Sequence, residues 1–384
     1  MRINMHNHSI LRVAFVGMFA FAAAIGVGRF AFTPLLPMMQ KDAGLTLSMG
    51  AWLASANYLG YLVGALSAIW IRLPATTMLR VALISIVALT IAMGVTRDPV
   101  LWLALRALAG VASAWGLIFA SASILPRLVA AGQKRLSGIV FGGVGLGMVL
   151  AGGVCLIAGG FEWSSSQIWQ MLGALALVLT GLAWPANGDT IDRAQIATPV
   201  PVVDDGSAIR KRLVIVLCYG VFGFAYIVPA TFLPAMARRA VADPAVFGWA
   251  WPVFGAAALA STLLAARLSS VLSNRRIWAL GHLVMAFGVA VPLVWQGIGG
   301  IIAASLCVGG TFMVVTLSGL QEAQRLAQGN SARLIAGMTT AFATGQVLGP
   351  ILIGVLAGSS SGLQISLSVA SLSLVATALI LFRR

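Results

Sequence analysis

The chain has 384 residues, of which 60% are hydrophobic and 9% charged, and its mean hydropathy is +1.00. Soluble domains carry about a quarter charged residues, so this composition argues strongly against a water-soluble fold. Lys and Arg outnumber Asp and Glu by 24 to 9, which gives a formal net charge of +15. These basic residues gather between apolar segments, a pattern typical of loops that face anionic lipid and not of a nucleic-acid-binding surface.

Apolar segments of roughly 20 residues, the length that spans a bilayer, follow one another along the whole chain. They predict an all-α integral membrane protein with twelve transmembrane helices, at about 13–39, 48–71, 79–96, 100–125, 136–160, 166–185, 213–237, 248–267, 277–296, 299–321, 333–357 and 363–382. A polar stretch at 186–212 reads as a linker between two bundles of six helices. The predicted parts are therefore a tail (1–12), an N-terminal bundle (13–185), the linker (186–212) and a C-terminal bundle (213–384).

The basic residues also predict the orientation of the helices. If the N-terminus is cytoplasmic, the outer loops hold only Lys41, Arg97, Arg238 and Arg239, and nearly all other Lys and Arg lie on the inside. Such an asymmetry follows the positive-inside rule. We therefore expect both termini on the cytoplasmic side and an even number of helices.

The first predicted helix returns at the start of the second half. When Pro37 is aligned with Pro234, Gly26 falls on Gly223 and Arg29 falls on Tyr226. A similar overlay pairs Gly147 with Gly345 in the later helices. Because each half contains six helices, both halves insert the same way round, and the repeat is predicted to be parallel, about an axis along the membrane normal.

Arg29 and Arg106 lie inside predicted helices, at nearly the same depth. An ionised side chain there costs at least about 2.5–3.5 kcal/mol on insertion scales, so such residues are rarely accidental. No acidic residue is predicted at that depth, and guanidinium groups match carboxylate, phosphate or sulfonate. We therefore hypothesise an organic anion as substrate. The alternative is that each arginine snorkels or binds backbone carbonyls opened by glycines and Pro34.

Further polar side chains in the apolar segments are candidates for the same cavity. They are Asn57, Tyr58, Tyr61, Trp115, Tyr226, Thr311 and Gln346. Each could instead hold helices together. The prolines near the outer face are predicted to bend the first and seventh helices at a gate, or to form fixed kinks, and they are Pro34, Pro37, Pro229 and Pro234.

Proton coupling needs a titratable group in the transport path, and the membrane segments offer few. Glu322 and His282 are the candidates. Glu322 could instead pair with Arg325 at the cytoplasmic end of its helix, and His282 could be a packing residue. The sequence holds neither a metal-site spacing nor a motif for nucleotide binding or hydrolysis, so we expect no cofactor, no metal and no enzymatic activity.

Three stretches resemble the major facilitator superfamily. They are R-A-L-A-G-V-A-S-A from Arg106, G-V-G-L-G-M-V-L-A-G from Gly143, and G-A-L-S-A-I-W-I-R from Gly64, the last with Ala68 where an aspartate is usual. Within the superfamily, three others are similar to the YbfB/YjiJ-like branch of bacterial transporters: G-V-G-R-F-A-F-T-P-L-L-P from Gly26, W-L-A-S-A-N-Y-L-G-Y-L-V-G-A from Trp52, and T-G-Q-V-L-G-P from Thr344.

The resemblance implies a multi-pass secondary carrier in the bacterial cytoplasmic (inner) membrane that works by alternating access. Its partners would be the lipid bilayer and a small organic solute, moved with or without a proton, and we expect a monomer. Two other functions stay open. One is efflux of amphipathic compounds, which would use aromatic side chains and tolerate loss of either arginine. The other is a non-transporting membrane sensor built on the same scaffold.

Overall fold

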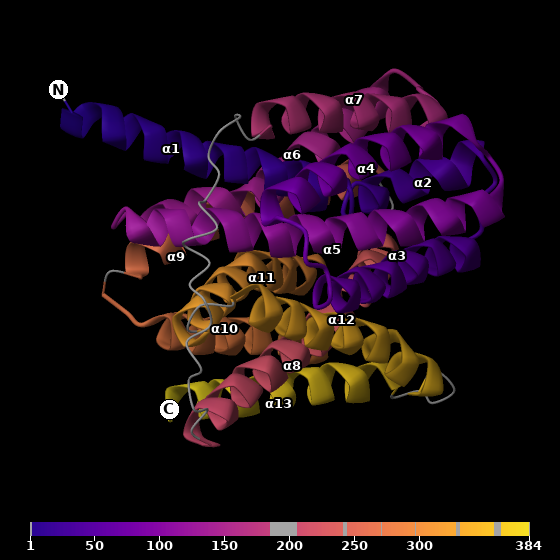
Figure 1. Cartoon of the computed structure of the whole chain (residues 1–384). Helices are drawn as coiled ribbons and strands as arrows, with labels where there is room; N and C mark the ends of the chain where they lie inside the picture. Colours follow the sequence, from indigo (N-terminus) through magenta and orange to yellow (C-terminus); the bar gives the residue numbers. More distant parts are fainter. Residues whose placement is uncertain are drawn as a thin grey trace.

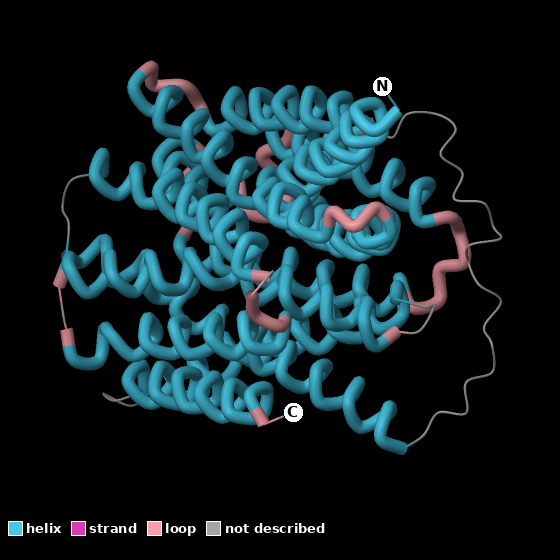
Figure 2. Tube along the Cα trace, turned by 90° about the vertical axis from the view of Figure 1, so that its left-hand side faces the viewer, coloured by secondary structure: helices cyan, strands magenta, loops and turns pink. Residues whose placement is uncertain are grey.

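The computed structural model describes residues 2–184, 206–240, 244–269, 271–295, 297–327, 331–356 and 362–383, and within these ranges all regular structure is helical (Figure 2). The helices are α1 (Arg2–Phe21), the π-helix η1 (Ala22–Val27), α2 (Phe32–Asp42), α3 (Leu47–Ala68), α4 (Ala75–Val95), α5 (Pro99–Ala130), the 3-10 helix η2 (Lys134–Leu136), α6 (Ser137–Gly160), α7 (Ser165–Ala183), α8 (Gly206–Ala240), α9 (Pro244–Leu268), α10 (Asn274–Val294), α11 (Ile298–Leu326), α12 (Ser331–Leu356) and α13 (Gly362–Phe382).

Ten helical segments of the described chain are long and apolar enough to cross a membrane. The first of them, Ile10–Asp42, combines α1, η1 and α2. Two further helices of 22 and 26 residues, α3 and α12, face each other across the middle of the molecule. The structure is therefore that of a multi-pass membrane protein.

The first helix differs most from the sequence-based expectation. A single segment at 13–39 was predicted, but α1 already begins at Arg2, and the helix changes to π geometry at Ala22–Val27. A turn at 28–31 separates η1 from α2. Helix one is therefore interrupted before its prolines are reached.

The helices form two groups that lie on top of each other (Figure 1). In the upper group α1 packs on α5, α6 and α7, while α3 and α4 pack on α5. In the lower group α8 packs on α11, α12 and α13, and α10 packs on α11 and α13. The groups are joined mainly by α6 with α9 and by α3 with α12, and α5 also contacts α12 and α11. The start of α1 and the end of α13 lie at the same end of the molecule, which we call the termini end (Figure 1).

Two pairs of glycines make the same contact in the two groups. A Cβ built on Gly26 would lie 2.5 Å from the Cα of Gly147, so η1 and α6 touch through their backbones. In the lower group a Cβ on Gly345 would lie 3.2 Å from the carbonyl carbon of Gly223, so α12 and α8 touch in the same way. The sequence overlay had paired Gly26 with Gly223 and Gly147 with Gly345. Such close approach between membrane helices requires small residues.

Several contacts hold the two groups together at the termini end. The Nζ of Lys134 donates a hydrogen bond of 2.9 Å to the Oδ1 of Asn274, and the amide of Gln324 donates one of 3.3 Å to the carbonyl of Ser121. Beside them, Gly138 at the start of α6 leaves no room for a Cβ against Ala266 near the end of α9. The described helices are thus closely packed across the groups at this end.

Candidate functional site

The interruption of helix one places Arg29 in the turn between η1 and α2, at the middle of the molecule. The Gly28 N–H donates to the carbonyl of Ala23 at 3.0 Å and the Phe30 N–H to that of Ile25 at 3.2 Å, the longer-range bonds of a π-helix. Next, the Thr33 N–H donates to the carbonyl of Phe30 at 3.2 Å. Pro34 has no N–H to continue the regular ladder. Bulges of this kind inside membrane helices often occur at functional sites.

Arg106 of α5 binds the backbone at this turn. Its two terminal nitrogens donate hydrogen bonds to the carbonyls of Gly28 (3.2 Å) and Arg29 (3.1 Å), and its guanidinium lies 4.9 Å from the Phe32 ring centre. Arg106 is only 3% exposed. The backbone-carbonyl alternative raised from the sequence thus describes the bonds that Arg106 makes. In this arrangement Arg106 fixes the position of Arg29.

The Arg29 side chain extends between the two groups of helices and is 5% exposed. Its guanidinium donates a hydrogen bond to the side-chain oxygen of Gln346 on α12. Aromatic rings surround the same group, with centroids at 4.1 Å for Tyr61, 5.6 Å for Tyr58 and 6.0 Å for Phe342. Such rings attract a cation through their electron-rich faces. Arg29 is therefore a buried cation held by neutral partners.

The acidic side chains that the structure describes all lie elsewhere. Asp42 accepts a hydrogen bond from the backbone of Ser165, and Asp98 caps α5. Glu162 is exposed in a turn after α6, and Glu322 pairs with other arginines. Within the described residues, the positive charge of Arg29 therefore has no carboxylate partner.

Several buried polar atoms around Arg29 are also without a hydrogen-bond partner. The donors are the Nε of Arg29 itself, the Nε of Arg106, the Nε2 of Gln346 and the Nε1 of Trp251, and the one acceptor is the Oδ1 of Asn57. The indole of Trp251 lies next to Phe30, with 6.1 Å between the two ring centroids. Unpaired buried donors are costly, and an acceptor-rich ligand would satisfy them. The centre of the molecule is thus rich in donors and positive charge.

Two more of the predicted residues belong to this centre. The Asn57 amide donates to the Arg106 carbonyl at 2.9 Å, and Asn57 is 1% exposed. The Tyr226 ring stacks on Phe312 at 5.4 Å and on Phe342 at 6.4 Å. Tyr226, which the repeat pairs with Arg29, and Arg29 itself therefore both contact the ring of Phe342.

Trp115 and Thr311 make local bonds instead. The Trp115 indole donates to the Ser67 hydroxyl at 3.0 Å, which ties α5 to α3. The Thr311 hydroxyl donates back to the carbonyl of Cys307 in its own helix, at 2.5 Å. Trp115 therefore has the helix-packing role that was the alternative, whereas the Thr311 hydroxyl bonds within α11 and joins no second helix.

The two coupling candidates lie apart from Arg29. Glu322 is 2% exposed and accepts hydrogen bonds of 2.8 Å from both Arg275 and Arg325, so the expected pair with Arg325 is present together with a second partner. His282 is fully buried between α10 and α13, where Trp278 donates to its Nε2 at 2.8 Å and Thr377 lies 2.9 Å from its Nδ1. Both ring nitrogens of His282 thus make hydrogen bonds inside the helix packing.

The four prolines do not interrupt their helices. Pro34 and Pro37 lie within α2, and α8 runs without a break through Pro229 and Pro234. Pro229 is buried, whereas the side chain of Pro234 lies outside the described part of the chain. The interruption of helix one comes before Pro34, at the π-helix.

Sequence reasoning missed the aromatic residues that enclose the centre, namely Phe30, Trp251, Phe254, Phe312 and Phe342. In an apolar segment an aromatic side chain carries no distinctive signal. Only the position of Phe30 next to Arg29 could have pointed to one of them.

In the described part of the chain all regular structure is helical, ten segments are long enough to cross a membrane, and a cation is buried between two groups of helices, which defines a multi-pass membrane protein. A family model described as the uncharacterised MFS-type transporter YbfB matches residues 21–382, so the chain belongs to this family of the major facilitator superfamily. The resemblance seen in the sequence is thereby confirmed. No curated protein matches the chain. Membership makes the chain a membrane protein of a secondary-transporter family that acts on small molecules.

Proposed function

We propose that the protein transports a small organic anion, which binds Arg29 between the two groups of helices. The observation that carries this proposal is the buried guanidinium of Arg29, 5% exposed, with Gln346 and aromatic rings around it and no described carboxylate beside it. A buried charge without a counter-ion is strongly unfavourable. An anionic substrate would supply the missing charge.

The neighbouring groups fit the two parts of such a substrate. The unpaired donors of Arg29, Gln346 and Trp251 suit the oxygens of a carboxylate, phosphate or sulfonate. The rings of Tyr58, Tyr61 and Phe342 offer apolar faces to an organic moiety.

The proposed mechanism is alternating access. The described contacts close the termini end, where α6 packs on α9 and Lys134 bonds to Asn274. The same two helices also touch toward the far end, where Gly145 packs on Gly255 and Gly152 on Pro252. Transport would then require the contacts at the two ends to separate and re-form in turn. Arg29 and Gln346 come from opposite groups, so an anion bound there would hold both groups in contact.

The architecture that we propose has twelve membrane spans, namely the ten apolar helical segments together with α3 and α12. They form two bundles at 13–185 and 213–384. The matching contacts of Gly26 with Gly147 and of Gly223 with Gly345 support a parallel repeat. The clustering of basic residues supports cytoplasmic termini. A monomer in the bacterial inner membrane, with no enzymatic activity, completes the proposal.

Flux measurements test this function. Organic acids that stabilise the purified protein would be loaded into proteoliposomes, and exchange of the labelled acid would be measured for wild type, Arg29→Ala and Arg97→Ala. Arg97 is an exposed arginine in the loop between α4 and α5, outside the superfamily motifs, and serves as the matched control. We expect exchange in wild type and Arg97→Ala, and its loss in Arg29→Ala. Binding without exchange in wild type would instead indicate the sensor.

The aromatic enclosure favours a second candidate, efflux of amphipathic compounds. Phe30, the residue after Arg29, contacts both Trp251 and Phe312. Such a carrier would transport neutral or cationic amphipathic compounds and would retain this activity in Arg29→Ala.

A further inference from the structure

A second polar site lies at the termini end, away from Arg29. It is a groove of about 610 Å³ lined by residues of η2, α10, α11 and α13 and by the turn before α10. Its cationic side chains are those of Lys134, Arg275, Arg276, Arg325 and Arg383, against the single carboxylate of Glu322. The described lining therefore carries a clear excess of positive charge.

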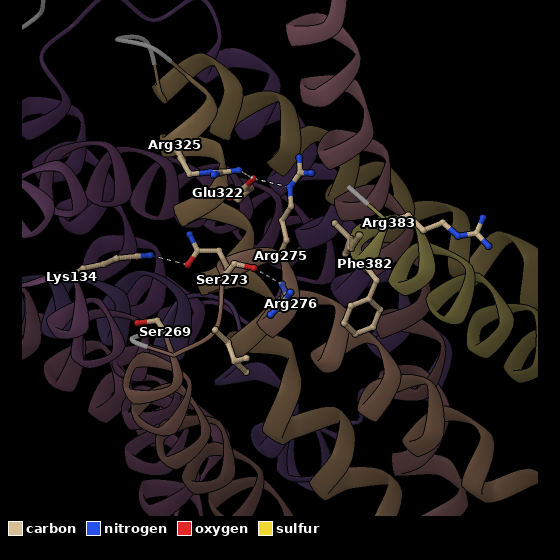
Figure 3. Close-up of a pocket in the computed structure, with 12 residues that line it drawn as sticks. Lys134, Ser269, Ser273, Arg275, Arg276, Glu322, Arg325, Phe382 and Arg383 are labelled. Atoms are coloured by element: carbon tan, nitrogen blue, oxygen red, sulfur yellow. Dashed lines mark hydrogen bonds and ion pairs between the residues drawn. The ribbon is translucent and has the colours of Figure 1, made fainter.

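Arg275 gives this groove the features of a built site. Its side chain is 10% exposed, and its Nε donates to Glu322 at 2.8 Å. One terminal nitrogen, Nη2, is buried and has no hydrogen-bond partner. Arg325 satisfies Glu322 from the other side, also at 2.8 Å, so the carboxylate is already shared (Figure 3). Because Nη2 is covered in this arrangement, an anion in the groove would engage it through a small shift of the Arg275 side chain.

The start of α10 adds backbone donors at the same place. Ser273 caps the helix by accepting from the Arg276 N–H at 3.4 Å, and Asn274 and Arg275 form its first turn. The first N–H groups of a helix and its dipole favour a bound anion. Lys134 reaches this turn from the other group of helices and bonds to Asn274 at 2.9 Å (Figure 3).

We propose that this groove binds a phosphate-bearing anion, either an anionic lipid headgroup or a soluble phosphate. Arg275 and Arg276 would contact the phosphate oxygens together with the start of α10, and Lys134 would complete the charge. Of the apolar lining residues, Leu272 is half-buried and Phe382 is exposed, so both offer apolar surface to the acyl end of a lipid. Because Lys134 belongs to one group and the arginines to the other, the bound anion stabilises the packing of the termini end. That last consequence rests on alternating access, whereas the binding itself does not.

Binding to the purified, delipidated full-length chain tests the proposal. Three probes are compared by thermal unfolding and by native mass spectrometry: short-chain phosphatidylglycerol, the phosphatidylcholine of equal chain length, and inorganic phosphate. The site variant is Lys134→Gln/Arg276→Gln. The control variant is Arg12→Gln/Arg97→Gln, which removes the same charge from exposed arginines outside the groove. Arg275→Lys is a third variant, because it keeps a cation beside Glu322 and removes the unpaired Nη2 donor.

In wild type and control, we expect an anionic probe at saturation to raise Tm by roughly 2–5 °C. In the site variant and in Arg275→Lys, the apparent Kd should be weaker by roughly tenfold. A response to phosphatidylglycerol alone identifies a lipid headgroup, and a response to inorganic phosphate identifies a soluble ligand. The proposal is overturned if neither phosphatidylglycerol nor inorganic phosphate raises the Tm of wild type, or if phosphatidylcholine raises it equally. It is also overturned if the control variant loses as much affinity as the site variant. Loss of anion transport in Arg29→Ala would not alter these results.

Discussion

The guanidinium of Arg29 donates a hydrogen bond to the side-chain oxygen of Gln346, 317 residues later in the chain. This contact joins the turn in helix one to α12 and crosses from one group of helices to the other. It places a neutral partner where a buried arginine would ordinarily have a carboxylate. An anionic substrate would supply the counter-ion that Gln346 cannot provide.

Replacing Gln346 by glutamate should supply the counter-ion permanently. We expect Gln346→Glu to raise the Tm of the empty protein and to abolish stabilisation by organic anions, because the new carboxylate competes for Arg29. Gln346→Leu is the uncharged comparison, and it should weaken anion binding by roughly tenfold without raising Tm. Unchanged anion affinity in Gln346→Glu would place the substrate elsewhere.

Arg106 should act through the backbone that it binds. In Arg106→Leu the carbonyls of Gly28 and Arg29 lose their donors, at a cost of about 1–3 kcal/mol for each buried carbonyl. We expect a Tm lowered by several degrees, together with weaker anion binding as Arg29 shifts. Arg106→Lys keeps one donor group, so its Tm and its anion affinity should lie between those of wild type and Arg106→Leu. A variant with wild-type Tm and no anion binding would instead show that Arg106 contacts the substrate itself.

The close contact of η1 with α6 should not tolerate a side chain at Gly147. A Cβ there would lie 2.7 Å from the Cα of Gly26, and overpacking costs about 1–3 kcal/mol. Gly153 on the same helix has open space at its Cβ position and is the matched control. Thermal unfolding should therefore show a lower Tm for Gly147→Ala and an unchanged or slightly higher one for Gly153→Ala. Equal Tm values would contradict the backbone contact.

Alternating access predicts that locking the termini end stops transport. Gly138 and Ala266 face each other across the α6–α9 interface. A Cβ on Gly138 would lie 2.4 Å from that of Ala266, so the two helices must move apart by about 1–2 Å there to reach the Cβ separation of a disulfide. In Gly138→Cys/Ala266→Cys, oxidation should abolish flux and reduction should restore it. Gly153→Cys/Ala266→Cys is the control, and oxidant should leave its flux unchanged. Full flux in a demonstrably cross-linked Gly138→Cys/Ala266→Cys protein would exclude a moving interface at this end.

Much of the helical framework follows from the sequence because membrane spans depend on local composition and length. The family assignment likewise followed from short motifs spread along the chain. The interruption of helix one did not follow, since it depends on contacts with distant residues. Gly26 packs on Gly147, and the carbonyls of Gly28 and Arg29 are satisfied by Arg106. Prolines mark bends locally, whereas a π-helix held by tertiary contacts leaves no such mark.

The candidate site was visible from the sequence as separate polar residues and not as an arrangement. Arg29 and Gln346 were both identified as unusual in apolar segments, but no local pattern indicates that they touch. Phe342 was missed because an aromatic residue in a membrane helix is ordinary. Arg275 was missed as a ligand-binding candidate, since basic loop residues are expected on the cytoplasmic side. Its unpaired nitrogen is apparent only from the packing around Glu322.

The central claim is that Arg29 holds the negative charge of the substrate. Its most direct test is thermal stabilisation of the purified protein by an organic acid compared with the primary amide of the same acid, in wild type, Arg29→Ala and Arg97→Ala. The account predicts that the acid raises Tm in wild type and in Arg97→Ala, that the amide has little effect, and that Arg29→Ala responds to neither. Equal stabilisation by acid and amide, or an unchanged response to the acid in Arg29→Ala, would contradict it.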